Sequence, residues 1–249
     1  MSSLTISVVV FACVFGGALL GIFIHLPERY VASDSKDAIK LGMGLVATTV
    51  ALVLGLLVSS AKSFYDTQNA ELTQLAANIV SLDRILAHYG PETGEARAAL
   101  RNSVARQVAI TWPRDDADKV HYQPTAERAE AVLDAIQELS PKSDRQRVLQ
   151  TQALALAIQT GQTRQLMLAQ ATASIPMPFG AMVVFWLIVL FLSFGLFARP
   201  NMAVMIALSF SALAVCGAVF LILEMYHPYA GLIRVSDAPM RAALAQLGQ

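Results

Sequence analysis

The chain has 249 residues, of which 55% are hydrophobic and 14% are charged, and its mean hydropathy is +0.54. An ordinary soluble domain carries about 25% charged residues, so this composition excludes a typical water-soluble globular protein. The 18 basic residues balance the 18 acidic residues, which gives no support to binding of nucleic acid or of a strongly charged substrate. We therefore expect the lipid bilayer as the main partner and no nucleic acid partner.

Four long stretches without a charged residue predict four transmembrane helices. Each has about the 20 residues that an α-helix needs to cross a hydrocarbon core of about 30 Å. Helices are expected because lipid offers no partners for the polar groups of an irregular backbone or an open strand edge. The expected spans are residues 4–24, 41–61, 178–197 and 202–223. We expect the first span to be retained, since no basic residue precedes it and no cleavage signal follows it.

The segments between the spans define the expected organisation. A polar loop is expected at 25–40, and a connection of only four residues, 198–201, joins spans three and four. The expected parts in chain order are a transmembrane hairpin at 1–61, a soluble helical domain at 62–177, a second hairpin at 178–223 and an interfacial tail at 224–249. The predicted fold is an all-α integral membrane protein with a helical domain inserted between the second and third spans.

The second span is predicted to continue as a helix beyond the membrane, because apolar residues recur at heptad spacing from Tyr65 to Tyr89. Gly90 and Pro91 then suit a helix end and the first turn of a new helix. Further helices are expected at about 91–111, 125–139 and 142–173, with a loop rich in Pro and Asp at 112–124. The last of these helices is rich in Gln, which predicts a partly polar interface with its neighbours.

Basic residues in the short connections predict the orientation in the membrane. Arg29, Lys36, Lys40 and Arg199 crowd the two hairpin connections, whereas the flanks on the other side of the spans carry fewer basic residues relative to their length. Short basic loops stay in the cytoplasm. The count therefore predicts a protein of the plasma (inner) membrane whose soluble domain and termini are extracytoplasmic.

Small residues recur at every fourth position within three of the spans and predict faces on which helices pack closely. Such faces can join helices of one chain or helices of neighbouring copies in a homo-oligomer. The predicted packing residues are Gly17 and Gly21 in the first span, Ala47, Ala51, Gly55 and Ser59 in the second, and Ala203, Ala207 and Ser211 in the fourth.

No pattern in the sequence predicts a catalytic, cofactor-binding or metal site. Gly42, Gly44 and Ala47 imitate a dinucleotide fingerprint, but no strand precedes them and no acidic residue follows at the spacing that binds ribose. Glu224 and His227 have the spacing of a helical pair of metal ligands, but no second such pair completes a site. We therefore expect no enzyme and no cofactor, and interfacial roles for Glu224 and His227.

A polar path through the membrane would depend on the second span. No ionisable side chain occurs in the spans until Glu224 at the end of the fourth, which disfavours a proton-coupled transporter. Hydroxyl and aromatic side chains suit a weakly selective pore, although hydroxyl groups in membrane helices often bond to their own backbone instead. The candidate pore-lining residues are Thr48, Thr49, Ser59, Ser60, Phe64 and Tyr65.

Several segments resemble a family of bacterial membrane proteins of uncharacterised function that are described as bestrophin-like. The resemblance covers nearly the whole chain. It is carried by residues 34–45 and 58–66, by Leu82-Asp-Arg84 and Tyr89-Gly-Pro-Glu92, and in the tail by Pro228 and residues 231–236 and 242–248. The family commonly has an Asp-Arg pair before the tail proline, where this chain has Tyr226 and His227, so any role of that charged pair is not expected here.

The resemblance implies an anion channel of the bestrophin type, in which several copies surround a central pore. It also implies a large cytosolic domain, which is the opposite of the orientation predicted from the charges. Two hypotheses follow. The first, which the sequence favours, is a membrane-anchored interaction or sensory module, and the alternative is an oligomeric bestrophin-like ion channel. The sequence names no ligand, ion or protein partner.

Overall fold

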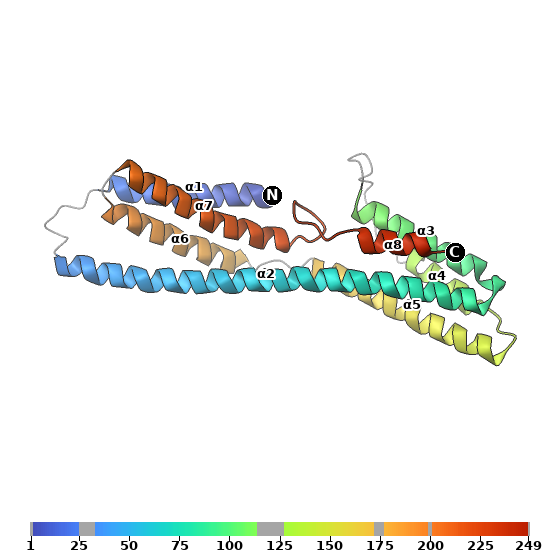
Figure 1. Ribbon diagram of the computed structural model, residues 1–249. Helices are drawn as coiled ribbons and strands as arrows, with labels where there is room; N and C mark the ends of the chain where they lie inside the picture. Colours follow the sequence, from blue (N-terminus) through green and yellow to red (C-terminus); the bar gives the residue numbers. More distant parts are fainter. Residues whose placement is uncertain (1, 25–32, 114–126, 172–176, 199–200, 249) are drawn as a thin grey trace. The chain divides into compact units, whose positions relative to one another are not determined.

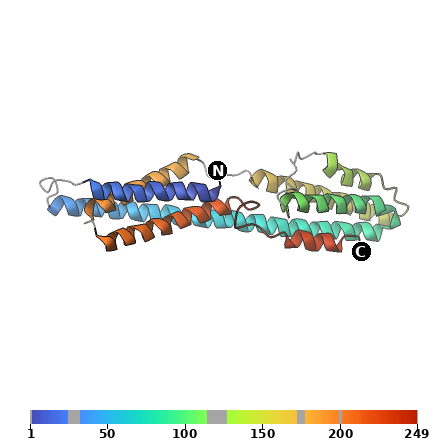
Figure 2. The same ribbon diagram turned by 90° about the horizontal axis from the view of Figure 1, so that it is seen from above.

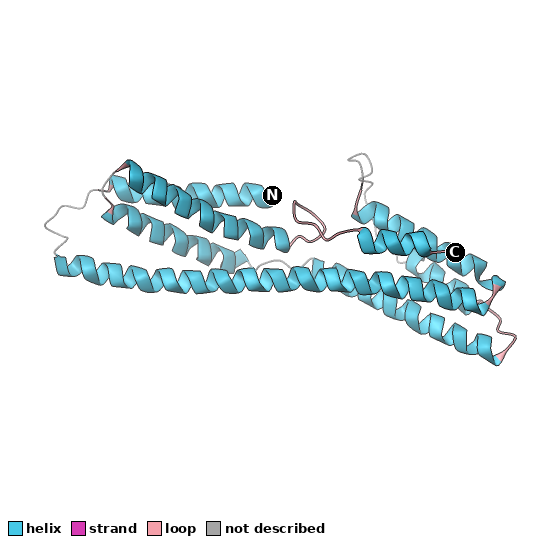
Figure 3. Ribbon diagram, in the orientation of Figure 1, coloured by secondary structure: helices cyan, strands magenta, loops and turns pink. Residues whose placement is uncertain are grey.

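A computed structural model describes residues 2–24, 33–113, 127–171, 177–198 and 201–248, and every regular element within these ranges is a helix (Figure 3). In chain order the helices are α1 (Ser3–Phe23), α2 (Ser33–Tyr89), the short 3-10 helix η2 (Pro91–Thr93), α3 (Gly94–Thr111), α4 (Glu127–Gln137), α5 (Asp144–Ala171), α6 (Met177–Phe197), α7 (Met202–Met225) and α8 (Ala238–Gln246) (Figure 1). The expected loop at 112–124 lies mostly outside the described residues.

Four of these helices are long and apolar enough to cross a membrane, which confirms the predicted all-helical class with four candidate spans. They are α1, α2 from Ile39 onward, α6 from Pro178 onward, and α7. The continuation of α2 to Tyr89 is also confirmed, and the helix has 57 residues. Its beginning was predicted wrongly, because residues 33–40 are helical rather than part of a loop. That segment contains no Gly or Pro that would interrupt a helix.

The chain forms two compact units. The first contains Met1–Tyr65 and Ala173–Ile233, and the second contains Asp66–Thr172 and Arg234–Gln249. The tail expected at 224–249 is thus divided between them, and it includes a helix, α8, that was not expected. An alanine-rich sequence with Pro239 in its first turn accounts for this helix.

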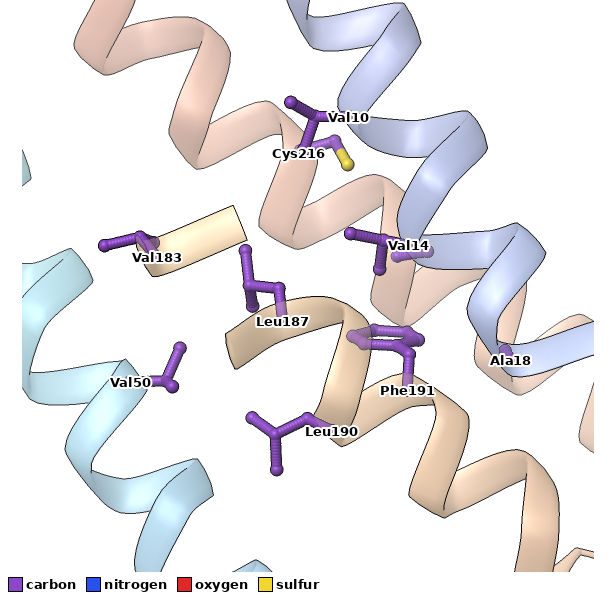
Figure 4. Close-up of a cluster of buried hydrophobic side chains, with 10 residues drawn as sticks. Val10, Val14, Ala18, Val50, Val183, Leu187, Leu190, Phe191 and Cys216 are labelled. Carbon is purple, nitrogen blue, oxygen red and sulfur yellow. The ribbon is translucent and has the colours of Figure 1, made fainter. Parts of the chain in front are cut away.

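A hydrophobic cluster joins the helices of the first unit. Both views of the molecule place α1 beside α6 and α7 (Figures 1 and 2). Figure 4 shows the buried side chains of the cluster pointing toward one another from α1, α2, α6 and α7. Its members are Val10, Val14, Ala18, Val50, Val183, Leu187, Leu190, Phe191, Ala212 and Cys216. Because lipid is as apolar as these side chains, close packing rather than exclusion of water holds such helices together.

Glycines allow α1 and α6 to meet backbone to backbone. A Cβ atom on Gly21 would lie 2.8 Å from the backbone nitrogen of Leu196 and would also overlap the carbonyl oxygen of Leu192. A Cβ atom on Gly195, in α6, would overlap the carbonyl oxygen of Ala18 in the same way. Any side chain at Gly21 or Gly195 would therefore push the two helices apart.

The second unit has an apolar core built largely on α2. The heptad residues of α2 from Leu72 to Tyr89 are buried, and Gln68, which interrupts the apolar series, has an exposed fraction of 0%. Its side chain donates a hydrogen bond of 2.5 Å to the side-chain oxygen of Gln170 in α5. Buried apolar side chains also come from the other helices of this unit and from the residue that follows α8: Leu100, Val104, Val108, Ile136, Ala153, Met240 and Leu247.

Glutamines of α5 satisfy carbonyl groups at the ends of other helices. Gln146 donates to the carbonyl of Tyr89 at 3.2 Å, and Gln150 donates to the carbonyls of Ile136 and Leu139, both at 2.9 Å. The last carbonyls of a helix have no partner within the helix and need one from outside. This accounts for the partly polar interface that the sequence predicts for α5.

Hydrogen bonds attach the C-terminal segment to the rest of the second unit, and one of their acceptors, Asp83, also forms an ion pair with Arg97. The carboxylate of Asp83 accepts two hydrogen bonds from Arg97, at 2.8 and 2.9 Å, and one from the backbone N–H of Gly248 at 3.3 Å. Burial raises the pKa of Asp83, but the hydrogen bonds and charge of Arg97 and the Gly248 N–H outweigh it, so this pKa lies below its ordinary value. Trp112 donates its indole N–H to the carbonyl of Val235 at 3.0 Å.

Candidate functional site

The candidate site is one face of α2 in the first unit, which we call the outward α2 face. An α-helix turns about 100° per residue, so residues at intervals of three and four share a side. The outward α2 face consists of Leu41, Leu45, Thr48, Leu52, Gly55 and Ser59, all of which are exposed in the single chain. The opposite side carries Val50 and Ala61, with exposed fractions of 3% and 0%.

This part of α2 has little to pack against within one chain. Only 6% of the most apolar stretch of α2 is buried, compared with 33% for α1 and 28% for α6. Leu41, Leu45 and Leu52 have exposed fractions of 78%, 72% and 65%. An apolar face of this length requires lipid or another copy of the chain to cover it.

The threonine hydroxyl groups of α2 bond to their own helix. Thr48 donates to the carbonyl of Gly44 at 2.9 Å, and Thr49 donates to the carbonyl of Leu45 at 3.0 Å. Each hydroxyl oxygen keeps lone pairs that can accept a hydrogen bond from water. The outward α2 face is therefore weakly polar and carries no charge.

Two of the candidate pore-lining residues contact Tyr226, the residue that follows α7, instead of lying on the outward α2 face. The Ser60 hydroxyl lies 3.3 Å from the hydroxyl of Tyr226. The Phe64 ring stacks on the Tyr226 ring, with 5.3 Å between ring centroids and 22° between ring planes. Tyr65 is half-buried. The structure thus brings Thr48 and Ser59 together on one face and places Ser60 and Phe64 on the flank of α2.

Glu224 is buried at the end of α7, with an exposed fraction of 3%. One carboxylate oxygen accepts hydrogen bonds from the backbone N–H groups of Leu232 at 2.6 Å and Ile233 at 3.2 Å. The ring nitrogen Nδ1 of His227 lies 2.8 Å from the carbonyl oxygen of Leu223. Glu224 and His227 are therefore each engaged by backbone groups. Within the described ranges, no group of three or more His, Cys, Asp and Glu residues could hold a metal ion.

The predicted packing residues divide into two sets. A Cβ atom on Gly17 would lie 3.2 Å from the carbonyl oxygen of Ile188, Gly21 meets α6 as described above, and Ala47 packs against the hydrophobic cluster. The remaining six are exposed in the single chain: Ala51, Gly55, Ser59, Ala203, Ala207 and Ser211. A Cβ atom on Gly55 would meet nothing within 4 Å.

Sequence reasoning missed Gly195, the glycine of α6 that faces Gly21. The third span has no repeat of small residues at four-residue spacing, which is the signal that marked the other spans. The available signal was a single glycine between Phe194 and Leu196 in a span of bulky residues.

The sequence profile of the bestrophin-like domain matches residues 8–240. The chain belongs to the bestrophin-like family. This confirms the resemblance seen in the sequence. Among curated proteins, no relative matches the chain.

Solved structures show the same fold over nearly the whole chain of this bestrophin-like protein. A bacterial bestrophin homologue from Klebsiella pneumoniae with a tryptophan-to-alanine mutation has a TM-score of 0.65 and 18% identity, covering 99% of this chain and 97% of its own. A leucine-to-threonine variant from the same organism has a TM-score of 0.64 and 17% identity, covering 98% and 99%. A membrane protein with a proline-to-alanine mutation has a TM-score of 0.65 and 15% identity, covering 97% of both chains.

Proposed function

We propose that this protein is an oligomeric ion channel in which copies of the outward α2 face surround the pore. The observation that carries the proposal is the long, uncharged and exposed face of α2, in which Thr48 and Ser59 supply the polar groups. Family membership and the fold shared with bacterial bestrophin homologues support this function better than the membrane-anchored interaction or sensory module that the sequence favoured. We propose no catalytic activity and no cofactor.

The physical argument concerns what covers α2. A ring of identical chains closes around a symmetry axis, and each chain then presents the same face to the centre. Hydroxyl groups on such a wall can hydrogen-bond to water, while leucines such as Leu52 narrow and dry it. The absence of charge on this face favours weak selection between small ions.

We further propose that residues 62–177 are inserted between the second and third spans as a water-facing helical domain, within which the Asp83–Arg97 pair lies. The exposed small residues of α2 and α7 that lie outside the outward α2 face, such as Ala51 and Ala207, would pack against neighbouring copies. This assignment is supported by the exposure of both residues in the single chain.

Replacing Thr48 with leucine is expected to reduce ion flux through reconstituted protein by about threefold to tenfold, because a hydroxyl group that contacts permeating water is lost. Flux across liposomes measures this. The mass of the detergent-purified protein is expected to be a multiple of the chain mass and to be unchanged by the substitution.

The wet face is tested separately by thiol labelling. After Cys13 and Cys216 are replaced, Ser59→Cys is expected to react with water-soluble thiol reagents, whereas Ala61→Cys, on the buried side of α2, is expected to stay unreactive. Ion-tight liposomes that contain folded protein, together with an unreactive Ser59→Cys variant, would contradict the channel and favour the membrane-anchored interaction or sensory module.

We infer from the basic residues of the hairpin connections that the second unit and both termini are extracytoplasmic in the plasma (inner) membrane. Arg29 and Arg199 lie outside the described residues, so this inference rests on the sequence. An exported enzyme fused after Gln249 is expected to be active, and a fluorescent protein that matures only in the cytosol is expected to be dark. The opposite pair of results would place the domain in the cytosol, as the family resemblance implies.

A further inference from the structure

Glu224 is a buried acid at the end of an apolar helix that conduction along α2 does not use. A buried carboxylate is costly unless hydrogen bonds compensate it. The Glu224 carboxylate accepts hydrogen bonds from backbone N–H groups eight and nine residues further along the chain, at Leu232 and Ile233. The carboxylate therefore closes residues 226–233 into a compact loop, which we call the Glu224 loop.

The Glu224 loop is built around this carboxylate. Gly231 has φ +89°, a conformation that side chains rarely adopt, and a Cβ atom there would lie 2.9 Å from the carboxyl carbon of Glu224. At the start of the loop, the N–H of His227 bonds to the carbonyl of Glu224, and within it the N–H of Ala230 bonds to the carbonyl of His227, both at 3.0 Å. The carboxylate thus satisfies N–H groups that the turn leaves open.

The loop begins with Tyr226, which contacts α2. Its ring stacks on Phe64, and its hydroxyl lies 3.3 Å from that of Ser60. Ser60 follows Ser59, the last residue of the outward α2 face, and Phe64 lies about one helical turn further on. Tyr226 therefore holds α2 at the position where the candidate pore wall ends.

We propose that Glu224 is a positioning residue that fixes the Glu224 loop and, through Tyr226, sets the position of α2 at the end of the pore wall. This inference rests on the proposed channel function. It assigns a pore-setting role to two residues outside the pore, and Glu224 was expected only to be interfacial.

The first test is a double-mutant cycle between Glu224→Gln and Tyr226→Ala, read as thermal unfolding of the detergent-purified protein. Glutamine keeps the size of glutamate but lacks its charge, which weakens the hydrogen bonds from the loop. The loss of stability in the double mutant is expected to be smaller than the sum of the losses in the two single mutants, because both substitutions act on the same contact. Additive effects would overturn the link between Glu224 and Tyr226.

The second test is ion flux per folded oligomer. Tyr226→Ala and Glu224→Gln are both expected to change flux by about threefold to tenfold in the same direction, whereas Tyr226→Phe, which keeps the stacked ring, should stay within about twofold of the wild type. Phe185→Ala, at an exposed aromatic position on α6 to which no role is assigned, is the control and should leave flux unchanged. If Tyr226→Ala does not assemble, Tyr226→Leu retains the apolar bulk without the ring and takes its place.

The two readouts separate the failure of this inference from the failure of the channel function. Coupling between Glu224 and Tyr226 in a protein whose wild type conducts nothing would remove the channel and leave only a structural contact. If the wild type conducts ions and neither Tyr226→Ala nor Glu224→Gln changes the flux, the positioning role is overturned.

Discussion

Replacing Gly21 with valine is expected to separate α1 from α6 and to lower the free energy of unfolding by roughly 3 kcal/mol. The new side chain would meet backbone atoms of Leu192 and Leu196, and backbone atoms cannot move aside as a flexible side chain can. In a membrane, no hydrophobic force pulls the separated helices back together, because lipid covers their apolar faces equally well. The expected result is therefore loss of folded protein rather than a small shift.

The matched control is Gly16→Val in the same helix, since a Cβ atom on Gly16 would meet nothing within 4 Å. Thermal unfolding of both purified variants in one detergent checks the prediction. Equal stability of the two variants would mean that α1 and α6 do not meet at Gly21.

Replacing Asp83 with asparagine is expected to cost the second unit about 2 kcal/mol. The substitution leaves the Arg97 guanidinium without its carboxylate and weakens the acceptor for the Gly248 N–H. The side chain of Arg97 is 23% exposed, so water partly compensates its charge and the loss stays below that of a fully buried pair. Arg84→Ala, at the exposed next position, should change stability by less than about 0.5 kcal/mol. Chemical denaturation measures both.

The same ion pair predicts how stability depends on pH. The pKa of Asp83 lies below its ordinary value of 3.8, so the folded state binds the proton more weakly than the unfolded state does. The contribution of ionised Asp83 to the free energy of unfolding is therefore fully present at pH values above its ordinary pKa and is lost as pH falls through its lowered pKa. As pH is lowered from about 5, the wild type should lose its greater stability over Asp83→Asn. A difference in the free energy of unfolding that stays constant down to about pH 2 would contradict this.

The spans and the length of α2 could be predicted because their signals are local. A run of about 20 uncharged residues and a heptad series from Tyr65 to Tyr89 can be recognised without knowledge of the residues they will contact. The start of α2 at Ser33 was missed because polar residues without Gly or Pro fit a loop and a helix equally well. The helix α8 was missed because its sequence is short and contains a proline, which lies in its first turn.

The contacts that organise both units were beyond local reasoning. Asp83 was visible only as part of a family motif, since its partners stand 14 and 165 residues away. Glu224 was expected to face the interface, because a lone acid at a helix end gives no sign of the backbone groups it will bind eight residues later. Thr48 and Ser59 could be placed on one side of α2 by spacing alone, but only the packing of Val50 and Ala61 shows that this side is outward.

The attachment of the C-terminal segment also determines when, during synthesis, the second unit can finish folding. The indole of Trp112 bonds to Val235, which is 123 residues later in the chain, and Asp83 bonds to Gly248. The ribosome must therefore translate α6 and α7 before the second unit can complete its contacts. At 5 to 20 residues per second, the ribosome needs roughly 6 to 25 seconds to add the residues between Trp112 and Val235. During this time, the part of α3 that α8 later contacts stays open to chaperones, proteases and neighbouring nascent chains. A premature stop after α7 would leave that state permanent.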